Sequence, residues 1–395
     1  MNKKEVKKAP ALRFKGFTND WEQRKLGYEV NFYSGLTYHP DDIRNSGVFV
    51  IRSSNIKNNR LISADNVFVN PQIVNSKPVH INDIVVVVRN GSRKLIGKHV
   101  LIQHELHDTV IGAFMTGIRS SNNFFINATL DSQLFKKEIQ KNLGSTINQI
   151  TVKNFQNMVF GFPSKIEKDK IGKLFRIIDN IISLQQRKLE QIKLLKKAML
   201  QKILAETDNP YPKLRFFGFS NTWKKYTVNS LFKISRGYVL STTLTEANKS
   251  AHNPYPVYSS QTKNNGLMGY YNKYLYENAI TWTTDGANAG TVNYRSGKFY
   301  CTNVCGVILS DKVDANQLIA EELNTVSKRY VSYVGNPKLM NNVMANIKII
   351  IPDQYKERQQ ISQLFSRQDI FKDVYQRKQN VLKILKQFLL QNMFI

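Results

Sequence analysis

Polar side chains suited to DNA recognition follow several strand-like runs of the sequence. Arginine, lysine and amide groups can donate paired hydrogen bonds to base edges and phosphate oxygens, so their clustering on short turns predicts nucleic-acid contacts. In the first half of the chain the candidates are Arg52, Asn55, Lys57, Arg89, Asn90, Ser92, Arg93 and Lys94. In the second half they are Arg236, Tyr238, Ser260, Gln261, Lys263, Asn264, Thr284, Asp285, Asn288 and Lys338. An ordinary solvated turn explains each segment, taken singly, about equally well.

Sequence patterns typical of DNA-modifying enzymes are absent from the chain. Its Asn-Pro pairs are never followed by the second proline of an amino-methyltransferase loop, and its Gly-Lys pairs are never followed by the Ser or Thr of a phosphate-binding loop. His104 and His107 follow a β-like run without a third ligand nearby, so a surface loop is favoured over a metal site. We therefore assign no catalytic residue and no metal ligand, and we predict a non-catalytic protein.

The charge of the chain indicates a polyanionic partner. The formal net charge is +28 over 395 residues, and the excess is spread along the chain rather than confined to a tail. A basic protein of this kind is expected to lie in the field of nucleic acid over much of its length. A generally basic proteome is the alternative explanation.

The two cysteines, Cys301 and Cys305, lie in one alternating run. Their spacing predicts a single strand with both side chains on the same face. Two buried thiols in a reducing compartment are favoured over a disulfide or a zinc site. The N-terminus lacks the apolar core of a signal peptide, and no apolar run is long enough for a membrane span. We therefore expect a cytoplasmic protein.

Two internal repeats supply the elements that must position the candidate side chains. Residues 12–21 return as residues 214–223 at an offset of 202, with seven of ten positions identical. Residues 167–203 and 354–393 are related at an offset of 190 and carry apolar residues every three or four positions. This spacing is typical of long helices that pack against each other, and at ~1.5 Å per residue each would be on the order of 55 Å long. The chain therefore contains the same frame twice.

The regions between the repeated segments favour mixed α/β structure. Short runs of β-branched and aromatic residues alternate with turn residues. Strands are predicted at 48–51, 84–88, 100–102, 279–283, 290–293, 305–309 and 347–351, and short helices at 132–143 and 316–330. The predicted fold class is α/β (mixed α+β), with two domains separated by two long antiparallel coiled-coil helices in an internal pseudo-twofold repeat. The expected boundaries are 1–163 for the first domain, 164–205 for the first long helix, 206–352 for the second domain with its linker, and 353–395 for the second long helix.

The duplicated Leu-Arg-Phe-x-Gly-Phe-x-x-x-Trp motif beginning at Leu12 and Leu214, the two variable regions and the two related helices together resemble the specificity subunits of type I restriction-modification systems. The resemblance covers the whole chain. It implies that each variable region is a target recognition domain for one half of a bipartite, asymmetric DNA site. It also implies that this chain carries no cofactor, because S-adenosylmethionine, ATP and Mg²⁺ are expected on partner subunits. The implied partners are double-stranded DNA, two methyltransferase (modification) subunits, and restriction/translocase subunits.

The resemblance assigns the two long helices to spacing and docking. The apolar residues expected to bind partner subunits are Ile171, Leu174, Phe175, Ile178, Ile361, Leu364, Phe365 and Phe371. Half-sites on one face of B-DNA are expected about one turn apart, roughly 34 Å. The alternative function is a self-contained DNA-acting enzyme, a nuclease or methyltransferase with unrecognised motifs. A free-standing repressor or architectural protein is a third hypothesis.

Overall fold

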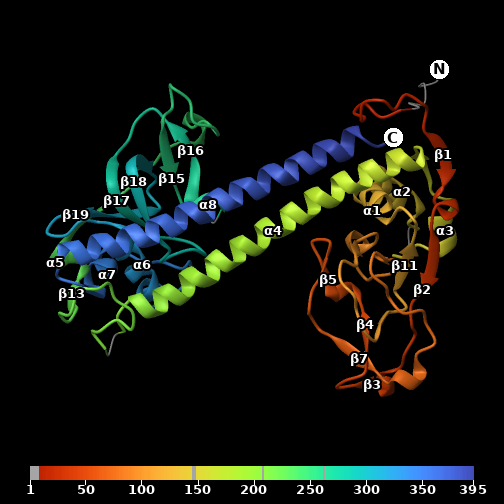
Figure 1. The fold of residues 1–395 in the computed structure, drawn as a ribbon. Coiled ribbons are helices and arrows are strands. Elements are labelled where there is room, and N and C mark those ends of the chain that lie inside the picture. The colour runs from red at the N-terminus through yellow and green to blue at the C-terminus, as the bar shows by residue number, and fades with distance from the viewer. Residues whose placement is uncertain (1–8, 145–147, 207–208, 261–262) are drawn as a thin grey trace. The chain divides into compact units, whose positions relative to one another are not determined.

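The computed structural model describes residues 9–144, 148–206, 209–260 and 263–395. The chain forms two compact units, whose elements are labelled in Figure 1. Unit 1 consists of Met1–Gln186 and Arg377–Ile395, and unit 2 consists of Arg187–Gln376. Each unit therefore combines one variable region with one part of each long helix.

Unit 1 is built on an antiparallel sheet in the order β2 (Asn31–Ser34), β11 (Met115–Arg119), β8 (Ile84–Val87) and β9 (His99–Leu101). The β-branched run of β8 is completely buried, as expected for a strand covered on both faces. A second sheet has the order β10 (Thr109–Ile111), β4 (Val48–Ile51), β7 (Val67–Val69) and β3 (Ile43–Arg44). The remaining strand pairs are β1 (Glu22–Lys25) with β12 (Val159–Phe162), and β5 (Ile56–Lys57) with β6 (Arg60–Leu61).

The short helices of unit 1 share one hydrophobic core, rich in aromatic residues, with the β2-β11-β8-β9 sheet. The short α-helices are α1 (Asn123–Asp131), α2 (Gln133–Asn142) and α3 (Val152–Asn157). The 3-10 helices are η1 (Leu26–Tyr28), η2 (Pro40–Asp42), η3 (Ser53–Asn55), η4 (Pro71–Ile73) and η5 (Arg93–Leu95). Trp21 of the duplicated motif packs edge-on against Phe125 and Phe394, so the motif is part of the core.

Unit 2 is built on a six-stranded sheet in the order β14 (Phe232–Arg236), β19 (Cys305–Ser310), β17 (Tyr276–Thr283), β18 (Val292–Cys301), β15 (Tyr255–Tyr258) and β16 (Leu267–Tyr271). A separate antiparallel pair joins β13 (Lys224–Thr227) to β20 (Lys348–Ile351). The short helices are α5 (Val228–Leu231), α6 (Gln317–Val326), α7 (Asn341–Asn346), η6 (Thr242–Leu244), η7 (Lys263–Gly266) and η8 (Ser327–Tyr330).

The two units share a strand frame although their variable regions differ in sequence. In unit 1 the order β2-β11-β8 is antiparallel throughout, and in unit 2 the order β14-β19-β17 repeats it. The pair β1–β12 likewise corresponds to β13–β20. Because backbone groups form these ladders, side chains can change while the pairing stays.

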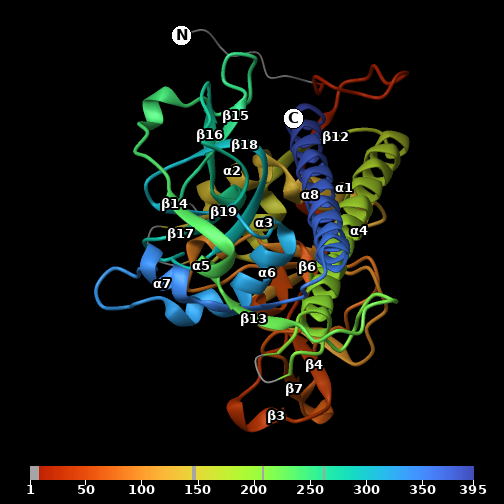
Figure 2. The same ribbon diagram turned by 90° about the vertical axis from the view of Figure 1, so that its left-hand side faces the viewer.

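The long helices are α4 (Lys165–Ile203) and α8 (Tyr355–Asn392). In unit 1 the first part of α4 contacts the last part of α8 through Asp179 and Lys386, 2.5 Å apart. Phe175 also packs against Phe394, two residues beyond the end of α8, with ring centroids 5.7 Å apart. In unit 2 the last part of α4 packs against the first part of α8 through Lys196 and Asp369, 2.7 Å apart. The helices are therefore antiparallel in each unit (Figures 1 and 2). The predicted fold class, with its antiparallel long helices and duplicated frame, is confirmed.

The prediction that Cys301 and Cys305 share one strand is wrong. Cys301 ends β18 and Cys305 begins β19, and the backbone N–H of Cys305 donates to the carbonyl of Thr302 in the turn between them. Both thiols are free and buried. Burial raises the pKa of the Cys305 thiol to about 11 and also raises the pKa of the Cys301 thiol. Among the described residues, no helix has the length and apolar character that a membrane crossing requires.

Candidate nucleic-acid interface

The duplicated motif ties the long helices to the frame of each unit. In unit 1 the guanidinium of Arg13 donates two hydrogen bonds to the carboxylate of Glu167, at 2.6 and 2.8 Å. In unit 2 Arg215 makes the same pair with Glu357, at 2.7 and 2.8 Å. Both carboxylates lie in the first turn of a long helix, where an acidic side chain also favours the helix dipole. Each motif therefore fixes the start of one long helix.

The same motif also fixes the end of the other long helix. The backbone N–H of Leu12 donates to the carbonyl of Asn392, the last residue of α8, at 2.8 Å. The N–H of Leu214 donates to the carbonyl of Lys202, near the end of α4, also at 2.8 Å. The two copies of the motif make equivalent contacts, so the sequence repeat corresponds to the same hydrogen bonds with the long helices in each unit.

A half-buried lysine joins the helix pair of each unit to its variable region. In unit 2 the ammonium of Lys196 lies 2.6 Å from Glu321 of α6 and 2.7 Å from Asp369 of α8. Burial opposes the charge of Lys196, but these carboxylates raise its pKa overall. The contacts in unit 1 are those of Lys386 with Asp131 (2.6 Å) and Asp179 (2.5 Å). Ion pairs, as well as packing, therefore connect the variable region of each unit to the long helices.

The predicted residues of unit 2 gather at one edge of its sheet. Strands β14 and β17 end at this edge and β19 begins there, because Arg236 pairs with Gly306 and Thr283 pairs with Cys305. The loop after β15 joins it, since the amide of Asn288 donates to the carbonyl of Ser260 at 3.1 Å. We call this surface, formed by residues 236–238, 258–260, 264–266, 284–288 and 332–338, the unit 2 edge.

Side chains at the unit 2 edge differ in their availability. Arg236, Tyr238 and Lys338 are exposed, as is Asn264, which adopts a positive φ of 52°. Thr284 is buried, and its hydroxyl donates to Asp285 at 2.6 Å. The hydroxyl of Thr284 is therefore occupied, and of these two side chains it is the carboxylate of Asp285 that remains as a hydrogen-bond acceptor. Gln261 lies outside the described residues, and only the backbone of Lys263 is described.

Unit 1 has an equivalent surface with different side chains, formed by residues 88–94, 114 and 148–150, which we call the unit 1 edge. The N–H of Val88 donates to the carbonyl of Phe114, and the carbonyl of Val88 accepts from the N–H of Ile150. In unit 2 Thr284 makes the same two backbone hydrogen bonds, to the carbonyl of Val304 and from the N–H of Leu339. The next residue along the chain is bridged in both units, Arg89 to Gln149 in unit 1 and Asp285 to Lys338 in unit 2. Equivalent backbone positions thus present a guanidinium and an amide in one unit, and a carboxylate and an ammonium in the other.

The unit 1 edge carries several of the other predicted residues. Arg89 is exposed, and its guanidinium lies 5.0 Å from the ring centroid of Phe114. Asn90 is engaged, because its amide donates to the hydroxyl of Ser53 at 2.9 Å and accepts from the N–H of Ser92 at 2.9 Å. Ser92, Arg93 and Lys94 are exposed on η5 and the residue before it. These residues form one continuous polar loop.

The second predicted segment of unit 1 is less available. Asn55 is completely buried, and its amide bonds Arg52, Ala64 and Asn66. No polar group of Asn55 is left for a base, so we remove it from the interface. Arg52 pairs with Asp65 at 2.6 Å, which partly occupies its guanidinium. Lys57 is exposed beside the β5–β6 turn.

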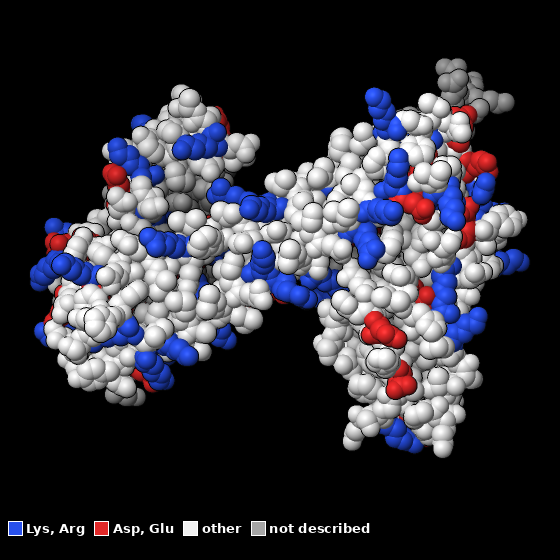
Figure 3. Space-filling model, viewed as in Figure 1, with Lys and Arg blue, Asp and Glu red and all other residues white. Residues whose placement is uncertain are grey.

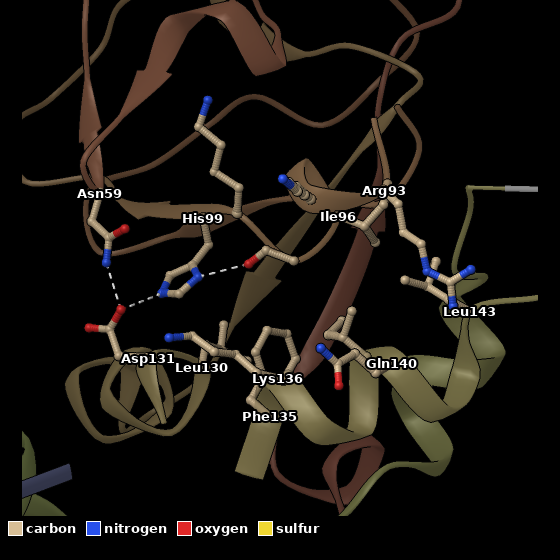
Figure 4. A pocket seen from close by; sticks show the side chains of 14 residues that line it. Asn59, Arg93, Ile96, His99, Leu130, Asp131, Phe135, Lys136, Gln140 and Leu143 are labelled. Carbon is tan, nitrogen blue, oxygen red and sulfur yellow. Dashed lines mark hydrogen bonds and ion pairs between the residues drawn. The ribbon is translucent and has the colours of Figure 1, made fainter. Parts of the chain in front are cut away.

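A pocket of about 610 Å³ opens beside η5 in unit 1 (Figure 4). Its basic lining residues are Arg93, Lys94, Lys98 and Lys136, and Phe135, Ile139 and Leu143 supply apolar surface. His99 is fixed on its wall by the carbonyl of Gly97 at 3.0 Å and by the carboxylate of Asp131 at 3.3 Å. The pocket extends the positive surface of the unit 1 edge onto α2. No sequence pattern indicated Lys98, Lys136 or Gln149 as site residues, because only folding of the chain brings them close to the loop of residues 89–94.

Most of the predicted partner-binding residues face inward. Ile171, Phe175, Ile178, Ile361 and Phe365 are buried, and Leu174 and Leu364 are packed against the same cores, so they hold the helices to their own units. The five buried residues are therefore not available to a partner, which corrects their assignment to partner binding, whereas Phe371 is exposed. The exposed apolar residues of α4 and α8 are Ile166, Ile177, Ile181, Leu184, Leu194, Leu195, Ile370, Phe371, Val374, Val381, Ile384, Leu385 and Phe388.

The charge on the molecular surface agrees with an anionic partner. Lys and Arg side chains are more numerous than Asp and Glu on the face drawn in Figure 3, and they lie over both units. Within the described ranges there is no group of three His, Cys, Asp or Glu residues that could hold a metal ion. His104 and His107 lie exposed in the loop before β10.

Comparison with known proteins gives the family. The family model of the type I restriction modification DNA specificity domain matches residues 18–194 and again residues 220–383. The chain belongs to this family. The two matches correspond to the two repeats, and DNA specificity is a function of recognition rather than catalysis. As a specificity protein it works with DNA and with other subunits, and the role requires no catalytic cofactor on this chain.

Individual relatives agree with the family match. The chain is 38% identical over 132 residues to the Mycoplasma pneumoniae protein named type I specificity subunit S.MpnORF289P N-terminus, covering 32% of this chain and 67% of that protein. It is 30% identical over 141 residues to the type I restriction enzyme MpnII specificity subunit of the same organism, covering 35% of this chain and 42% of the relative. The crystal structure of a type I S subunit from M. genitalium has the same fold, with a TM-score of 0.77 and 15% identity over 98% of this chain and 99% of the other.

Proposed function

We propose that each unit reads one half of a bipartite, asymmetric DNA site, so that the chain selects the target of a type I restriction-modification complex. The observation that carries this proposal is the equivalent edge of the two units, with Arg89 and Gln149 on one and Asp285 and Lys338 on the other. A guanidinium is the common donor to the two acceptors of guanine, whereas a carboxylate accepts from the amino group of cytosine. An asymmetric DNA site requires two recognition surfaces with different side chains. The two units supply these surfaces on the same backbone arrangement.

The remaining predicted residues fall into two groups within this proposal. Arg89, Arg236, Asp285 and Asn288 are proposed to contact bases, together with Ser260 and Thr284. Gln261 is proposed for the same group from the sequence alone, because it lies outside the described residues. Lys57, Ser92, Arg93, Lys94, Tyr238, Lys263, Asn264 and Lys338 are proposed to contact the sugar-phosphate backbone or to support the loops. Phosphate contacts fix the register of the protein on DNA, while base contacts select the sequence.

The partner subunits supply the chemistry in this proposal. Two methyltransferase subunits dock on the exposed apolar residues of α4 and α8, and restriction/translocase subunits join the complex they form. S-adenosylmethionine, ATP and Mg²⁺ bind to those partners, in the cytoplasm. The exposed apolar side chains of both long helices support this proposal. Single apolar residues scattered over a surface are ordinary, but these residues are numerous and lie on the same two helices.

Methylation of a host genome tests the proposal even while the target sequence is unknown. The chain is produced with its methyltransferase subunit, and sequencing of methylated positions gives the recognised motif. Arg89→Ala is expected to relax one half of that motif, because a bidentate base contact contributes about 1–3 kcal/mol of discrimination. Asp285→Asn is expected to alter only the other half.

Two outcomes contradict the proposal. One is a motif that changes in both halves, or in neither, with each single substitution. The other is methylation or cleavage of DNA by the purified chain alone, with S-adenosylmethionine or Mg²⁺ added, which supports the self-contained enzyme instead. Lys249→Ala, an exposed lysine outside the unit 2 edge, serves as the matched control and should leave the motif unchanged.

A further inference from the structure

The loop of residues 332–338 in unit 2 exposes two large side chains at its tip. Tyr333 is 71% exposed and Val334 is 92% exposed. Two backbone hydrogen bonds close the loop, from Ser332 to Lys338 at 2.8 Å and from Lys338 to Ser332 at 2.9 Å. Gly335 turns the tip with a φ of +74°, a conformation that other residues rarely adopt. The tip is therefore a defined turn that holds apolar side chains in solvent.

The loop is fixed to the segment of the unit 2 edge proposed to contact bases. The N–H of Gly286 donates to the carbonyl of Pro337 at 2.9 Å, and the N–H of Leu339 donates to the carbonyl of Thr284 at 2.8 Å. The ammonium of Lys338 lies 4.0 Å from Asp285. Figure 2 draws this loop, next to the label α7, extending outward from unit 2. Whatever the edge contacts is also within reach of the tip.

We propose that Tyr333 and Val334 form an apolar wedge that enters a DNA groove beside the second half-site and partly unstacks one base step. The inference rests on the proposed function, since it needs DNA on the unit 2 edge. Apolar side chains inserted between base steps open and kink a duplex, and the cost of unstacking is offset by wider contact. A tyrosine ring can also stack on an unstacked base, and Lys338 places a positive charge beside the neighbouring phosphates.

The chemistry of the loop favours DNA over a protein partner. The tip is joined through Thr284 and Gly286 to the base-contacting segment, whereas the exposed apolar residues proposed for protein docking are on the long helices. Lys338 borders the tip, and the exposed Arg329 precedes it in η8. A positively charged border around an apolar tip matches the stacked bases and outer phosphates of a duplex.

Base unstacking can be measured on the assembled complex. The methylated motif is first read from a host genome, and duplexes are made with 2-aminopurine at successive positions in and beside the second half-site. Binding of the complex of this chain with its methyltransferase subunit is expected to raise the fluorescence at one step. Tyr333→Ala with Val334→Ala should abolish this rise and weaken binding about tenfold, the loss of one stacking contact. Tyr333→Phe should retain the rise.

The controls separate this inference from the proposed function. Tyr211→Ala removes another exposed tyrosine, from the linker after α4, and it should change neither fluorescence nor affinity. If no methylated motif appears, the proposed function fails. If the motif is bound but no position brightens, and the double variant binds like the wild type, only the wedge is rejected. If the double variant instead loses the methyltransferase subunit during purification, the tip contacts protein and the wedge is again rejected. An unchanged unfolding midpoint verifies that the variant is folded.

Discussion

At the scale of single residues, the clearest structural device is the arginine that pairs with a buried glutamate at the start of each long helix. Glu167 is fully buried and Glu357 is 1% exposed, so neither carboxylate could remain charged at low cost without its partner. Bidentate pairing satisfies both oxygens of each carboxylate. The arginines recur because the duplicated motif must make this contact twice.

Removing one arginine should destabilise its unit strongly. Arg215→Met leaves Glu357 buried without its charge partner, which is expected to lower the free energy of unfolding by about 3–5 kcal/mol. Adding Glu357→Gln should recover part of the loss, because the unpaired charge is removed. Urea unfolding followed by tryptophan fluorescence measures both effects. The matched control is Lys213→Ala, which breaks an exposed pair with Glu206 and should cost less than about 1 kcal/mol. Equal losses in the single and double variants would contradict this account.

Glu322 makes the stability of unit 2 depend on pH. Burial raises the pKa of its carboxyl from 4.5 to about 7, although the N–H of Ile350 donates to one oxygen at 3.0 Å. The folded state therefore holds a proton that the unfolded state releases, and the free energy of unfolding should fall as the pH rises from about 4.5 to about 7. The fall should be roughly 3 kcal/mol at most.

Glu322→Gln tests this dependence. Compared with the wild type, the variant should become relatively more stable as the pH is raised from about 5 to about 7.5, as measured by urea unfolding at each pH. Glu105→Gln, in an exposed loop of unit 1, is the control and should follow the wild type throughout. Parallel pH profiles for wild type and Glu322→Gln would falsify the assignment.

At the scale of elements, α4 and α8 have apolar residues on two sides. One side faces the core of each unit, where Ile171, Phe175, Ile361 and Phe365 are buried. The other side remains exposed, and on α8 it includes Ile384 and Phe388. The first side stabilises the fold, while the second is available for the proposed partner subunits.

Substitutions on the two sides of α8 should therefore separate folding from assembly. Ile384→Ser with Phe388→Ser is expected to leave the free energy of unfolding within about 0.5 kcal/mol and to abolish copurification of the methyltransferase subunit. Phe365→Ala is expected to cost about 3–5 kcal/mol, because it opens a cavity in the core. Ile43→Ser, an exposed apolar residue away from the helices, controls for general loss of apolar surface. Retained copurification in the double variant would exclude this face as the docking surface.

The chain as a whole contains the same frame twice, and the two copies carry different side chains at their equivalent edges. Both long helices are continuous, at 39 and 38 residues, and each contributes to both units. The variable regions differ in the side chains at the two edges, whereas the contacts between the duplicated motif and the long helices are the same in both units. If each unit reads one half-site, as proposed, one half of the target can change while the other half is kept.

Lengthening both helices tests their proposed role in spacing the two half-sites. One heptad inserted into each helix adds about 10 Å of helical rise and keeps the apolar faces nearly in phase. The unmethylated spacer between unchanged half-sites is expected to become about three base pairs longer, as read from the methylated genome. Insertion of a heptad into only one helix is the control and should disrupt the paired helices. An unchanged spacer in the first variant would end the spacing hypothesis.

The duplication, the two long helices, the mixed α/β class and the basic character of the chain could all be predicted from the amino-acid sequence. These features are periodic or compositional, so they can be read from neighbouring residues without knowing their partners. The strands around Val50 and Val85 were predictable for the same reason, since a run of β-branched residues favours extended backbone locally.

Which of the predicted side chains are available to a ligand could not be predicted from the sequence. Asn55 has the same polar type as Asn264, yet the first is buried among backbone groups and the second is exposed. Likewise, Ile178 and Ile181 are neighbours on one helix, but only the first is buried. The correspondence of Arg89 with Asp285 also came from structure alone. Each of these outcomes depends on hydrogen bonds and packing between segments far apart in the chain, which local sequence patterns do not encode.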